Sequence, residues 1–454
     1  MLAVKKLESL ERQIRAALRS GDETMLRVTL ATQHPADIAD VIDRLDGDDE
    51  VQLFHLLSPA QAAAVLDEMS VDATRALVMR LPAAEVAAIL NQMPSDDAAE
   101  LLAEDVPERQ QALLMAMEAD DASAVRALLT YPLRSAGRMM TPYFVQVRQE
   151  MTIAETLTML RQLDPEIESV VDLYALDEDR RLQGVVSLRN VLTVAPSQTL
   201  ADVIDLQPVS VLPETDQEEV ARIVSQYDLL TVPVVQPNGR MLGIVTVDDV
   251  IDVFVQESTE DVLRFGAVQS GPQDESYFAT PVFRAVRRRV GWLLILFLTS
   301  TLTINVLTQF ESALDQVVAL SFFIPLLIGT GGNTGAQTVS TMVRGMALGE
   351  VQLRDGWHVL VRELCSGFVL GSLLSIAAFP FALLLGNPLD LALVVALSII
   401  VVCTWANMIG ALVPLLAQRV GLDPALVSAP LITTLVDATG LAIYLLIARA
   451  VLGL

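Results

Sequence analysis

The sequence predicts a multidomain protein with an α-solenoid, an α+β domain made of two similar units, a connecting helix and an all-α membrane domain of five helices. Three observations predict this architecture. Short helical units repeat in the N-terminal part, a strand and helix pattern then occurs twice, and five long apolar runs fill the C-terminal part. We expect the solenoid over residues 1–135, and the two similar units over 136–197 and 198–260. The connecting helix is expected over 261–285 and the membrane domain over 286–454.

Charge and hydrophobicity are divided unevenly along the chain. The 454 residues carry a formal net charge of −26, although 52% of them are hydrophobic. Residues 281–454 contain 8 acidic and 9 basic residues, whereas residues 1–280 contain 48 acidic and 21 basic residues. An acidic part of this kind repels the phosphates of nucleic acid, so we expect cations and not nucleic acid as its partners.

The solenoid is predicted from helical units such as PAQAAAVLDEM and PAAEVAAILNQM, which recur about every 12 or 24 residues between residues 25 and 130. Each unit opens with Pro or Asp, which suit the first turn and the cap of a helix. Apolar residues then follow at helical spacing. Because a single short helix cannot bury its apolar face alone, we expect the units to stack.

The α+β domain is predicted from a pattern that occurs twice from about residue 138. Each copy has about 60 residues, reads as β-α-β-β-α, and ends similarly, in LQGVVSLRNVL or MLGIVTVDDVIDVF. The duplication resembles a tandem CBS pair, a regulatory module that often senses nucleotides or ions, and RMMTP at 138–142 resembles its usual start. The alternative is a pair that serves only as a dimerisation scaffold.

Five apolar runs are long enough to cross a bilayer, which takes about 20 residues. They are Gly291–Phe310, Gln316–Val343, Leu364–Leu389, Leu391–Gln418 and Ala425–Ile447. Basic residues precede the first run and occupy the second and fourth connections, which places residues 1–280 in the cytoplasm and the C-terminus outside. The N-terminal residues lack a signal-peptide core, and both cysteines lie in apolar runs. We therefore expect a multi-pass protein of the cell (inner) membrane with cytoplasmic N-terminal domains.

Three signatures accompany this domain order: ESTEDVLRFGAV at 257–268, PLLIGTGGNTGAQ at 325–337 and APLITTLVDATG at 429–440. With them, nearly the whole chain resembles the MgtE family of magnesium channels. The resemblance implies a homodimeric, Mg²⁺-selective channel in the lipid bilayer. It also implies that cytosolic Mg²⁺ binds the acidic domains and closes the channel.

Asp437 is the only acidic residue within the five apolar runs. A charge at the bilayer centre costs about 3 kcal/mol or more, so such a residue usually faces a water-filled path. The alternative is a structural pair with a neighbouring helix, but no basic residue lies at similar depth in the other runs. Mg²⁺ keeps most of its water and takes about two carboxylates, so one Asp437 from each of two subunits suits a hydrated ion.

Two further residues are candidates for the same path. Thr433 lies one helical turn before Asp437, and the resemblance implies that its carbonyl borders the ion site. Asn333, in the Gly-rich signature, can bond water of a hydrated ion. Tight packing of the glycines is the alternative interpretation of this signature.

The resemblance also places regulatory Mg²⁺ sites at acidic positions of the cytoplasmic part. These are Asp96 and Asp97 in the solenoid, Asp216, Glu218, Asp228, Asp249 and Asp252 in the second unit, Glu257, Glu260 and Asp261 at the start of the linker, and Asp423 before the last run. Divalent cations that bridge carboxylates favour a compact state, because a ligand shifts the population toward the state that it prefers. If the compact state holds the connecting helices over the pore, Mg²⁺ limits its own entry.

Departures from the family pattern affect two expectations. Asn190 stands where the first CBS unit commonly has an Asp that grips a nucleotide ribose, which argues against ATP binding. Ala336 and Ala429 replace Asn residues of some members, and these changes affect the selectivity for Mg²⁺ over Mn²⁺, Co²⁺ or Zn²⁺ that the resemblance implies.

The sequence leaves alternatives to a channel. One alternative is a secondary transporter for divalent cations that is coupled to a Na⁺ or H⁺ gradient. Another is a receptor in which the membrane domain only anchors a sensor. An enzyme is not expected, because His34, His55 and His358 are scattered and no Cys/His pair has the spacing of metal ligands.

Overall fold

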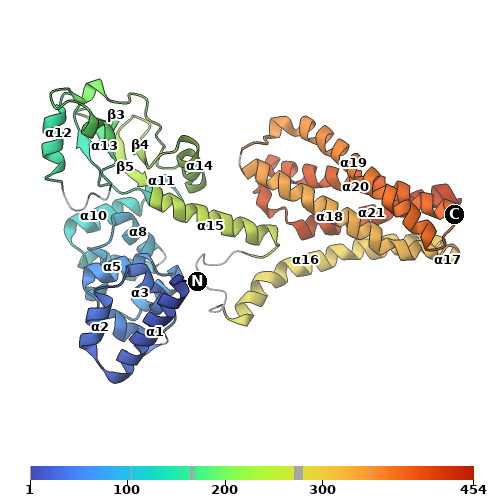
Figure 1. The fold of residues 1–454 in the computed structure, drawn as a ribbon, viewed down its shortest axis with the longest axis horizontal. Coiled ribbons are helices and arrows are strands. Elements are labelled where there is room, and N and C mark those ends of the chain that lie inside the picture. Colours follow the sequence, from blue (N-terminus) through green and yellow to red (C-terminus); the bar gives the residue numbers. More distant parts are fainter. Residues whose placement is uncertain are drawn as a thin grey trace. The chain divides into compact units, whose positions relative to one another are not determined.

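The computed structural model describes residues 2–45, 47–103, 105–163, 167, 169–269, 280–347 and 349–454. The chain forms two compact units, which divide between Glu257 and Ser258. The first unit contains the N-terminal helices and all strands of the described residues, and the second contains the long C-terminal helices (Figure 1).

Short helices make up the N-terminal part of the first unit (Figure 1). They are α1 (Leu2–Ser20), α2 (Glu23–Leu30), α3 (Pro35–Ile42), α4 (Asp48–Phe54), α5 (Pro59–Asp67), α6 (Val71–Val78), α7 (Ala83–Leu90), α8 (Ser95–Ala103), α9 (Pro107–Ala116), α10 (Ala119–Leu128) and α11 (Ala136–Met139). The expected start signals form, because Ser58 and Gln61 make a capping box at α5 and Pro35 occupies the first turn of α3.

Alternate helices of this part pack on one another. Helix α3 contacts α1 and α5, and α7 contacts α5 and α9. The apolar faces therefore meet in one continuous core, in which Leu53, Val65 and Leu77 are fully buried. Stacking supplies the partner that each short helix lacks on its own.

Two similar halves form the α+β part of the first unit. The elements are β1 (Gln146–Val147), α12 (Ile153–Leu160), β2 (Asp172–Leu176), β3 (Leu182–Ser187) and α13 (Leu188–Thr193), followed by α14 (Gln217–Tyr227), β4 (Thr231–Val235), β5 (Met241–Thr246) and the start of α15 (Val247–Phe265). Strand β2 runs antiparallel to β3 and parallel to β1, and β4 runs antiparallel to β5. Both antiparallel strand pairs shift register near their ends, so the two halves share this irregularity as well as the order of their strands.

Each half completes the sheet of the other. Thr141 pairs with Ile244 of the second half, and Asp205 pairs with Val185 of the first. The Tyr174 hydroxyl also donates to Thr231 Oγ1 across the halves at 2.7 Å. The two halves are therefore one folded body and not independent domains in series.

Long helices form the second unit. They are α16 (Val282–Gln309), α18 (Ala319–Ala347), α19 (Gly356–Leu384), α20 (Leu389–Arg419) and α21 (Ala429–Leu452), with the short α17 (Glu311–Gln316) after α16. Among the described residues, four helical segments are long and apolar enough to cross a membrane: Val282–Gln309, Leu353–Leu384, Leu389–Arg419 and Ala429–Leu452. Helix α18 is not one of the four, although it has 29 residues, because its Gly-rich half is more polar.

The expected connecting helix over 261–285 falls on two helices. Helix α15 ends at Phe265, and α16 begins at Val282. Residues 270–279 of this stretch lie outside the described residues. The first apolar helix thus starts nine residues before the expected Gly291 and includes the four arginines that precede it.

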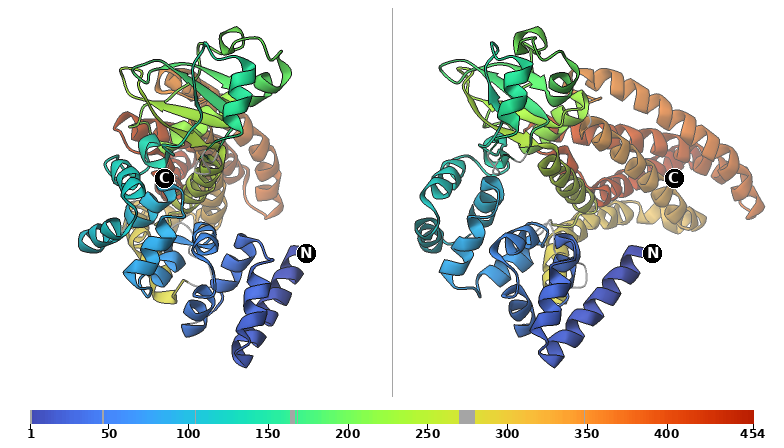
Figure 2. Two further views of the ribbon diagram at one scale, coloured as in Figure 1. Left: turned by 90° about the vertical axis from the view of Figure 1, so that its left-hand side faces the viewer. Right: turned by 60° about the vertical axis from the view of Figure 1, so that its left-hand side comes forward.

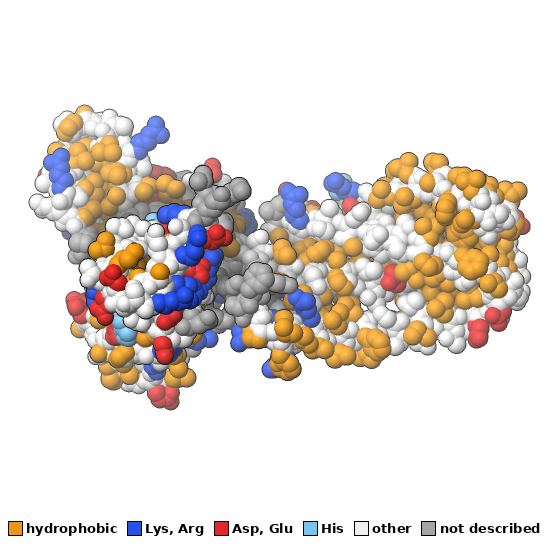
Figure 3. Space-filling model, turned by 60° about the horizontal axis from the view of Figure 1, so that its bottom comes forward, with side chains coloured by type: hydrophobic (Ala, Val, Ile, Leu, Met, Phe, Trp, Pro, Cys, Tyr) orange, Lys and Arg blue, Asp and Glu red, His pale blue; other side chains and the backbone are white. Residues whose placement is uncertain are grey.

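Helices α18, α20 and α21 lie side by side, and α19 packs along α20 (Figures 1 and 2). Hydrophobic side chains also cover much of the surface of this unit (Figure 3). Glycines allow the closest approach, because a Cβ atom on Gly371 of α19 would lie 2.7 Å from the Ile400 Cα atom of α20. An apolar surface of this extent, on helices of this length, suits a lipid environment.

We expect Gly371→Val to destabilise the second unit, because the added side chain collides with the α20 backbone and overpacking costs about 1–3 kcal/mol. Thermal unfolding of the full chain in detergent measures this as a lower midpoint. The matched control is Gly291→Val, since nothing lies within 4 Å of a Cβ atom built on Gly291. Equal midpoints for the two variants would contradict the close packing of α19 on α20.

Candidate ion pathway and regulatory acid clusters

Asp437 lies two turns into α21, which begins at Ala429 with Pro430 in its first turn. The side chain is half-buried, and its Oδ1 atom is inaccessible and accepts no hydrogen bond from the described residues. No ion pair to Asp437 is formed within the described residues either. A buried carboxylate oxygen without a donor needs water or a cation. This orphaned oxygen is therefore the feature of the second unit that fits a divalent cation as cargo.

The backbone of α18 passes close to this carboxylate at a glycine. A Cβ atom on Gly332 would lie 3.3 Å from Asp437 Oδ1 and 2.7 Å from Thr433 Cγ2. Any larger residue at this position would fill the space beside the carboxylate. The Thr433 hydroxyl donates to the Ala429 carbonyl at 2.9 Å, so its methyl group is the part that faces α18. Thr433 and Asp437 are thus brought together, as the sequence predicts.

The Gly-rich signature has two different faces on a continuous helix. Gly331, Gly332 and Gly335 are buried, and each would collide with a side chain of α20 or α21 if it carried a Cβ atom. Asn333 and Gln337 are exposed on the opposite face, and neither side chain makes a hydrogen bond among the described residues. The glycines therefore serve close helix packing, whereas Asn333 is not brought against Asp437 within one chain.

A second polar group inside the helices escaped the sequence analysis. The Asn407 side chain of α20 is 1% exposed. It accepts a hydrogen bond from Thr338 of α18 at 2.8 Å and donates one to the Glu363 carboxylate of α19 at 3.3 Å. Asp437 remains the only acid of the five apolar runs, but α19 starts eight residues before the expected Leu364 and so also contains Glu363.

Several predicted regulatory acids have structural contacts in the α+β part. Asp216 caps α14 and accepts a hydrogen bond from the Glu218 amide at 2.9 Å. Asp228 ends the same helix in a left-handed conformation with φ of 53°. Glu257 accepts a hydrogen bond from Gln217 Nε2 at 2.7 Å. These acids surround both ends of α14 and the middle of α15, and Glu218 itself is exposed.

A second group of acids lies where the N-terminal helices come close to α15. Asp67, at the end of α5, is close enough to Asp248 and Asp252 for their charges to act on it, and it shares a hydrogen bond with Asp97 of α8. Burial is the main reason that the pKa of Asp67 is raised; the charges of Glu68, Asp252 and Asp248 add to it, whereas the hydrogen bond with Asp97 lowers it. Asp96, beside Asp97, is buried. The sequence analysis missed Asp67, because one acid at the end of a repeated helical unit carries no distinguishing signal.

Asp249 lies in the first turn of α15. Its Oδ2 atom accepts a hydrogen bond from the Thr246 hydroxyl at 2.5 Å. Burial raises the pKa of this carboxyl to about 7, and the charges of Asp248 and Asp252 act in the same direction. Protons therefore compete with any cation at this position near neutral pH.

The remaining predicted acids lie where α15 ends in the second unit. Glu260 is buried, Asp261 is half-buried, and Asp423 lies in the loop that leads to α21. Arg264 forms ion pairs with both Glu260 and Asp423. Sequence reasoning did not single out Arg264, whose partner Asp423 is 159 residues away.

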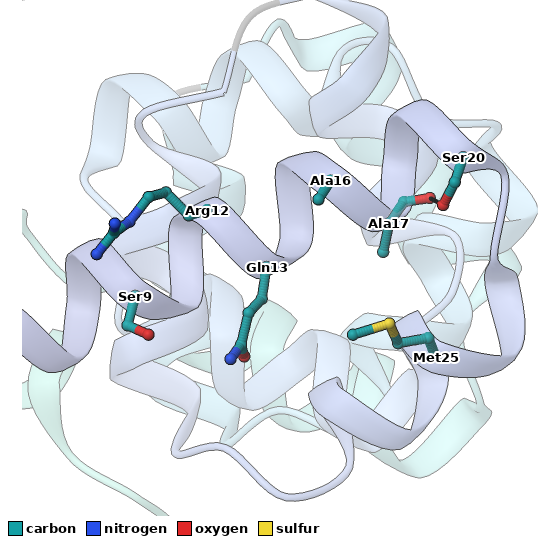
Figure 4. Close-up of a pocket in the computed structure, with 7 residues that line it drawn as sticks. All are labelled: Ser9, Arg12, Gln13, Ala16, Ala17, Ser20 and Met25. Atoms are coloured by element: carbon teal, nitrogen blue, oxygen red, sulfur yellow. Dashed lines mark hydrogen bonds between the residues drawn. The ribbon is translucent and has the colours of Figure 1, made fainter.

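No three His, Cys, Asp or Glu side chains in the described part of the chain converge closely enough to hold a metal ion. The acids form pairs and neighbouring groups instead. A shallow hollow between α1 and α2 offers no carboxylate at all (Figure 4). Its lining consists of Ser9, Arg12, Gln13, Ala16, Ala17, Ser20 and Met25. A cation held by two of these acids would therefore take its other ligands from water.

The chain is similar to known proteins over the part that contains Asp437. A family model described as a divalent cation transporter, MgtE, matches residues 324–447, which hold both the Gly-rich signature and Asp437. The magnesium transporter MgtE of Thermus thermophilus is 44% identical over 328 residues, which is 72% of each chain. The chain belongs to the MgtE family.

Other members and family models cover the remaining parts. The magnesium transporter MgtE of Bacillus subtilis is 37% identical over 72% of each chain. A model of the MgtE intracellular N domain matches residues 33–134, and CBS domain models match 136–197 and 200–256. The predicted tandem CBS pair and the resemblance to the MgtE family are therefore confirmed.

Solved structures agree with the cytosolic part of this family. The crystal structure of the cytosolic domain of the Mg²⁺ channel MgtE in complex with ATP covers 54% of this chain and 99% of that chain, with 37% identity and a TM-score of 0.52. A structure of the soluble part of a magnesium transporter matches with the same TM-score at 27% identity. In this MgtE-family chain, Asn190 donates through its side chain to the Val203 carbonyl at 3.4 Å, so the amide has a contact within the fold.

Proposed function

We propose that this chain carries Mg²⁺ into the cell through a channel formed by two copies of it. The observation that carries the proposal is Asp437 Oδ1, a buried carboxylate oxygen without a hydrogen-bond donor, inside apolar helices and beside the Gly332 backbone. Relatives named as magnesium transporters support the choice of ion. Two Asp437 carboxylates on a two-fold axis would supply the two charges that a hydrated Mg²⁺ accepts.

The proposal includes a topology. All five long helices cross the inner membrane, with α18 lining the path, because its polar residues are then spared from lipid. The arginines at the start of α16 mark the cytoplasmic side, so the N-terminal helices and the CBS pair are cytoplasmic and the C-terminus is outside. The stacked N-terminal helices form an acidic solenoid, 136–197 and 198–260 are the CBS units, and residues 261–285 connect them to the membrane domain 286–454.

Closure by cytosolic Mg²⁺ is the second part of the proposal. The charges of Asp248 and Asp252 already act on Asp67, and this repulsion opposes further compaction. Mg²⁺ that bridges such carboxylates favours the compact state by its differential affinity. Regulatory ions are assigned to the predicted acids together with Asp67, whereas the pore ion is assigned to Asp437 and Thr433, since Asn333 lies on the opposite face of α18.

The pKa of Asp249 makes this regulation dependent on pH. A carboxyl with a pKa raised to about 7 is roughly 10% ionised at pH 6 and roughly 90% ionised at pH 8. We therefore expect Mg²⁺ to close the channel at a lower concentration at pH 8 than at pH 6. Flux measured against cytosolic Mg²⁺ at the two pH values checks this, and Asp249→Asn should reduce the difference. An equal pH dependence in Asp249→Asn would exclude Asp249 as its source.

The same carboxyl has a consequence for folding with the opposite sign. Because its pKa is higher in the folded chain than in the unfolded chain, burial of the ionised form is unfavourable. Its contribution to the free energy of unfolding falls as pH rises from about 4 to about 7 and stays low above that range.

A gradient-coupled transporter of divalent cations, Mg²⁺ or Mn²⁺, Co²⁺ and Zn²⁺, is the second candidate, and Glu363 favours it. An acid held by Asn407 between three helices is a type of residue that relays protons or coupling ions in transporters. Dependence of uptake on a Na⁺ or pH gradient, lost in Glu363→Gln, would support coupling. Single-channel currents without a gradient dependence would support the channel.

The central experiment is flux in liposomes that contain the purified full chain, with Mg²⁺ varied on each side. We expect Mg²⁺ entry that depends on Asp437 and is inhibited by Mg²⁺ on the side of the CBS pair. Absence of flux with correctly folded protein would reject the proposal and would leave the receptor that only anchors a sensor.

A further inference from the structure

The end of α15 is part of the unit that carries Asp437. Phe265, its last residue, packs against a buried cluster on α18, α20 and α21. The cluster includes Ile432 and Val436, which flank Thr433 on α21. The side chain one residue before Phe265 is therefore close to the start of the helix that holds the proposed pore acid.

That side chain, Arg264, bridges two acids from separate segments. Its Nη2 atom donates to Glu260 of α15, and its Nη1 atom donates to Asp423 of the loop before α21. Glu260 is 8% exposed, Arg264 28% and Asp423 39%, so water screens the pair with Glu260 less than the pair with Asp423. The planar guanidinium, with donors on several sides, suits two carboxylates at once.

We infer that Arg264 is a built-in competitor of the regulatory divalent cation at Glu260 and Asp423. This inference rests on the proposed closure by Mg²⁺ and names the residue that sets the Mg²⁺ concentration at which closure occurs. The guanidinium holds the carboxylate oxygens that a cation between these acids would use. A divalent ion at that place would also lie within a few ångströms of a positive charge, so the arginine must leave first.

A purely structural role for Arg264 predicts the opposite change in cation affinity when the arginine is removed. An arginine that only fastens α15 to the loop would keep Glu260 and Asp423 together and help a cation to bridge them. Its removal would then weaken cation binding. Competition requires that its removal strengthens cation binding, so one measurement of affinity separates the two roles.

The test measures binding of Mn²⁺, a paramagnetic divalent cation, to the purified full chain by electron paramagnetic resonance of the free ion. We expect Arg264→Gln to gain a site that binds Mn²⁺ roughly tenfold more tightly, which corresponds to about 1.4 kcal/mol. Arg264→Lys keeps the charge and should change the affinity less. Arg354→Gln removes a charge from an arginine without an ion pair in the described residues and should not change it.

Because the chain has many acids, a double-variant cycle identifies the site. The effect of Arg264→Gln should disappear when Asp423→Asn is also present, since the arginine then has no shared site to vacate. Unchanged or weaker Mn²⁺ binding in Arg264→Gln overturns the inference, and so does an equal gain in the Asp423→Asn background. The proposed function is tested separately by flux in liposomes. Mn²⁺ binding alone decides whether Arg264 competes with the cation, so the two proposals can fail independently.

Discussion

Asp437→Asn is expected to abolish Mg²⁺ flux. The substitution keeps the shape of the side chain and removes the charge of a carboxylate whose Oδ1 atom is buried and has neither a donor nor an ion pair in the described residues. A hydrated Mg²⁺ in a membrane needs negative charge to replace the solvation that it loses. Because two chains would each lose this charge, we expect flux to fall to the level of empty liposomes.

Two controls make this result interpretable. Asp390→Asn removes one exposed acid from the first turn of α20 and should preserve flux. Asp437→Asn should elute like the unaltered chain and unfold at no lower temperature, because the substitution breaks no hydrogen bond of Oδ1 and removes a buried charge. Flux above half of the unaltered level in Asp437→Asn would reject this residue as the pore ligand and the conduction pathway with it.

The combined variant Asp249→Asn, Asp252→Asn and Asp261→Asn should conduct at cytosolic Mg²⁺ concentrations that close the unaltered chain. The three acids lie on α15, the helix that leads from the CBS pair into the second unit. Asp252 acts on Asp67 of the N-terminal helices and on Asp249. Without their charges, the compact state gains little from Mg²⁺, so the population no longer shifts toward closure.

The matched control removes three charges from acids with no assigned role. Glu150, Glu178 and Asp179 are exposed, so their amide variants change the net charge equally and test the general effect of charge. Liposome flux at increasing Mg²⁺ on the cytoplasmic side compares the two triple variants. Normal closure in the α15 variant, or loss of closure in the control, would contradict regulation through α15.

The positions of helices could be predicted well because they depend on local signals. Caps such as Ser58 and prolines such as Pro35 mark helix starts that the structure contains. Length and apolar composition identify α16, α20 and α21 within a few residues, apart from the arginine-rich extension of α16. The start of α19 was misplaced, because Arg362 and Glu363 interrupt its apolar pattern although the helix continues through them.

The candidate site was predicted only in part. Asp437 and Thr433 were found because both lie on one helix with a spacing that sequence reveals. Asn333 was assigned from the Gly-rich signature, but the fold turns it away from the buried face on which Gly332 meets Asp437. Which face of α18 is buried depends on α20 and α21, and no property of the α18 sequence alone specifies those neighbours.

The sequence by itself determined the order of domains, the duplication of the CBS pair, the apolar helices and the isolated acid in the last of them, because periodicity, hydrophobicity and charge are properties of neighbouring residues. Only the tertiary structure decided that Asp67 lies near Asp252, that Asn407 joins Thr338 to Glu363, and that Arg264 holds Asp423. These contacts join residues far apart in the chain, and their partners are chosen by helix packing, in which glycines such as Gly332 and Gly371 set how closely two backbones approach.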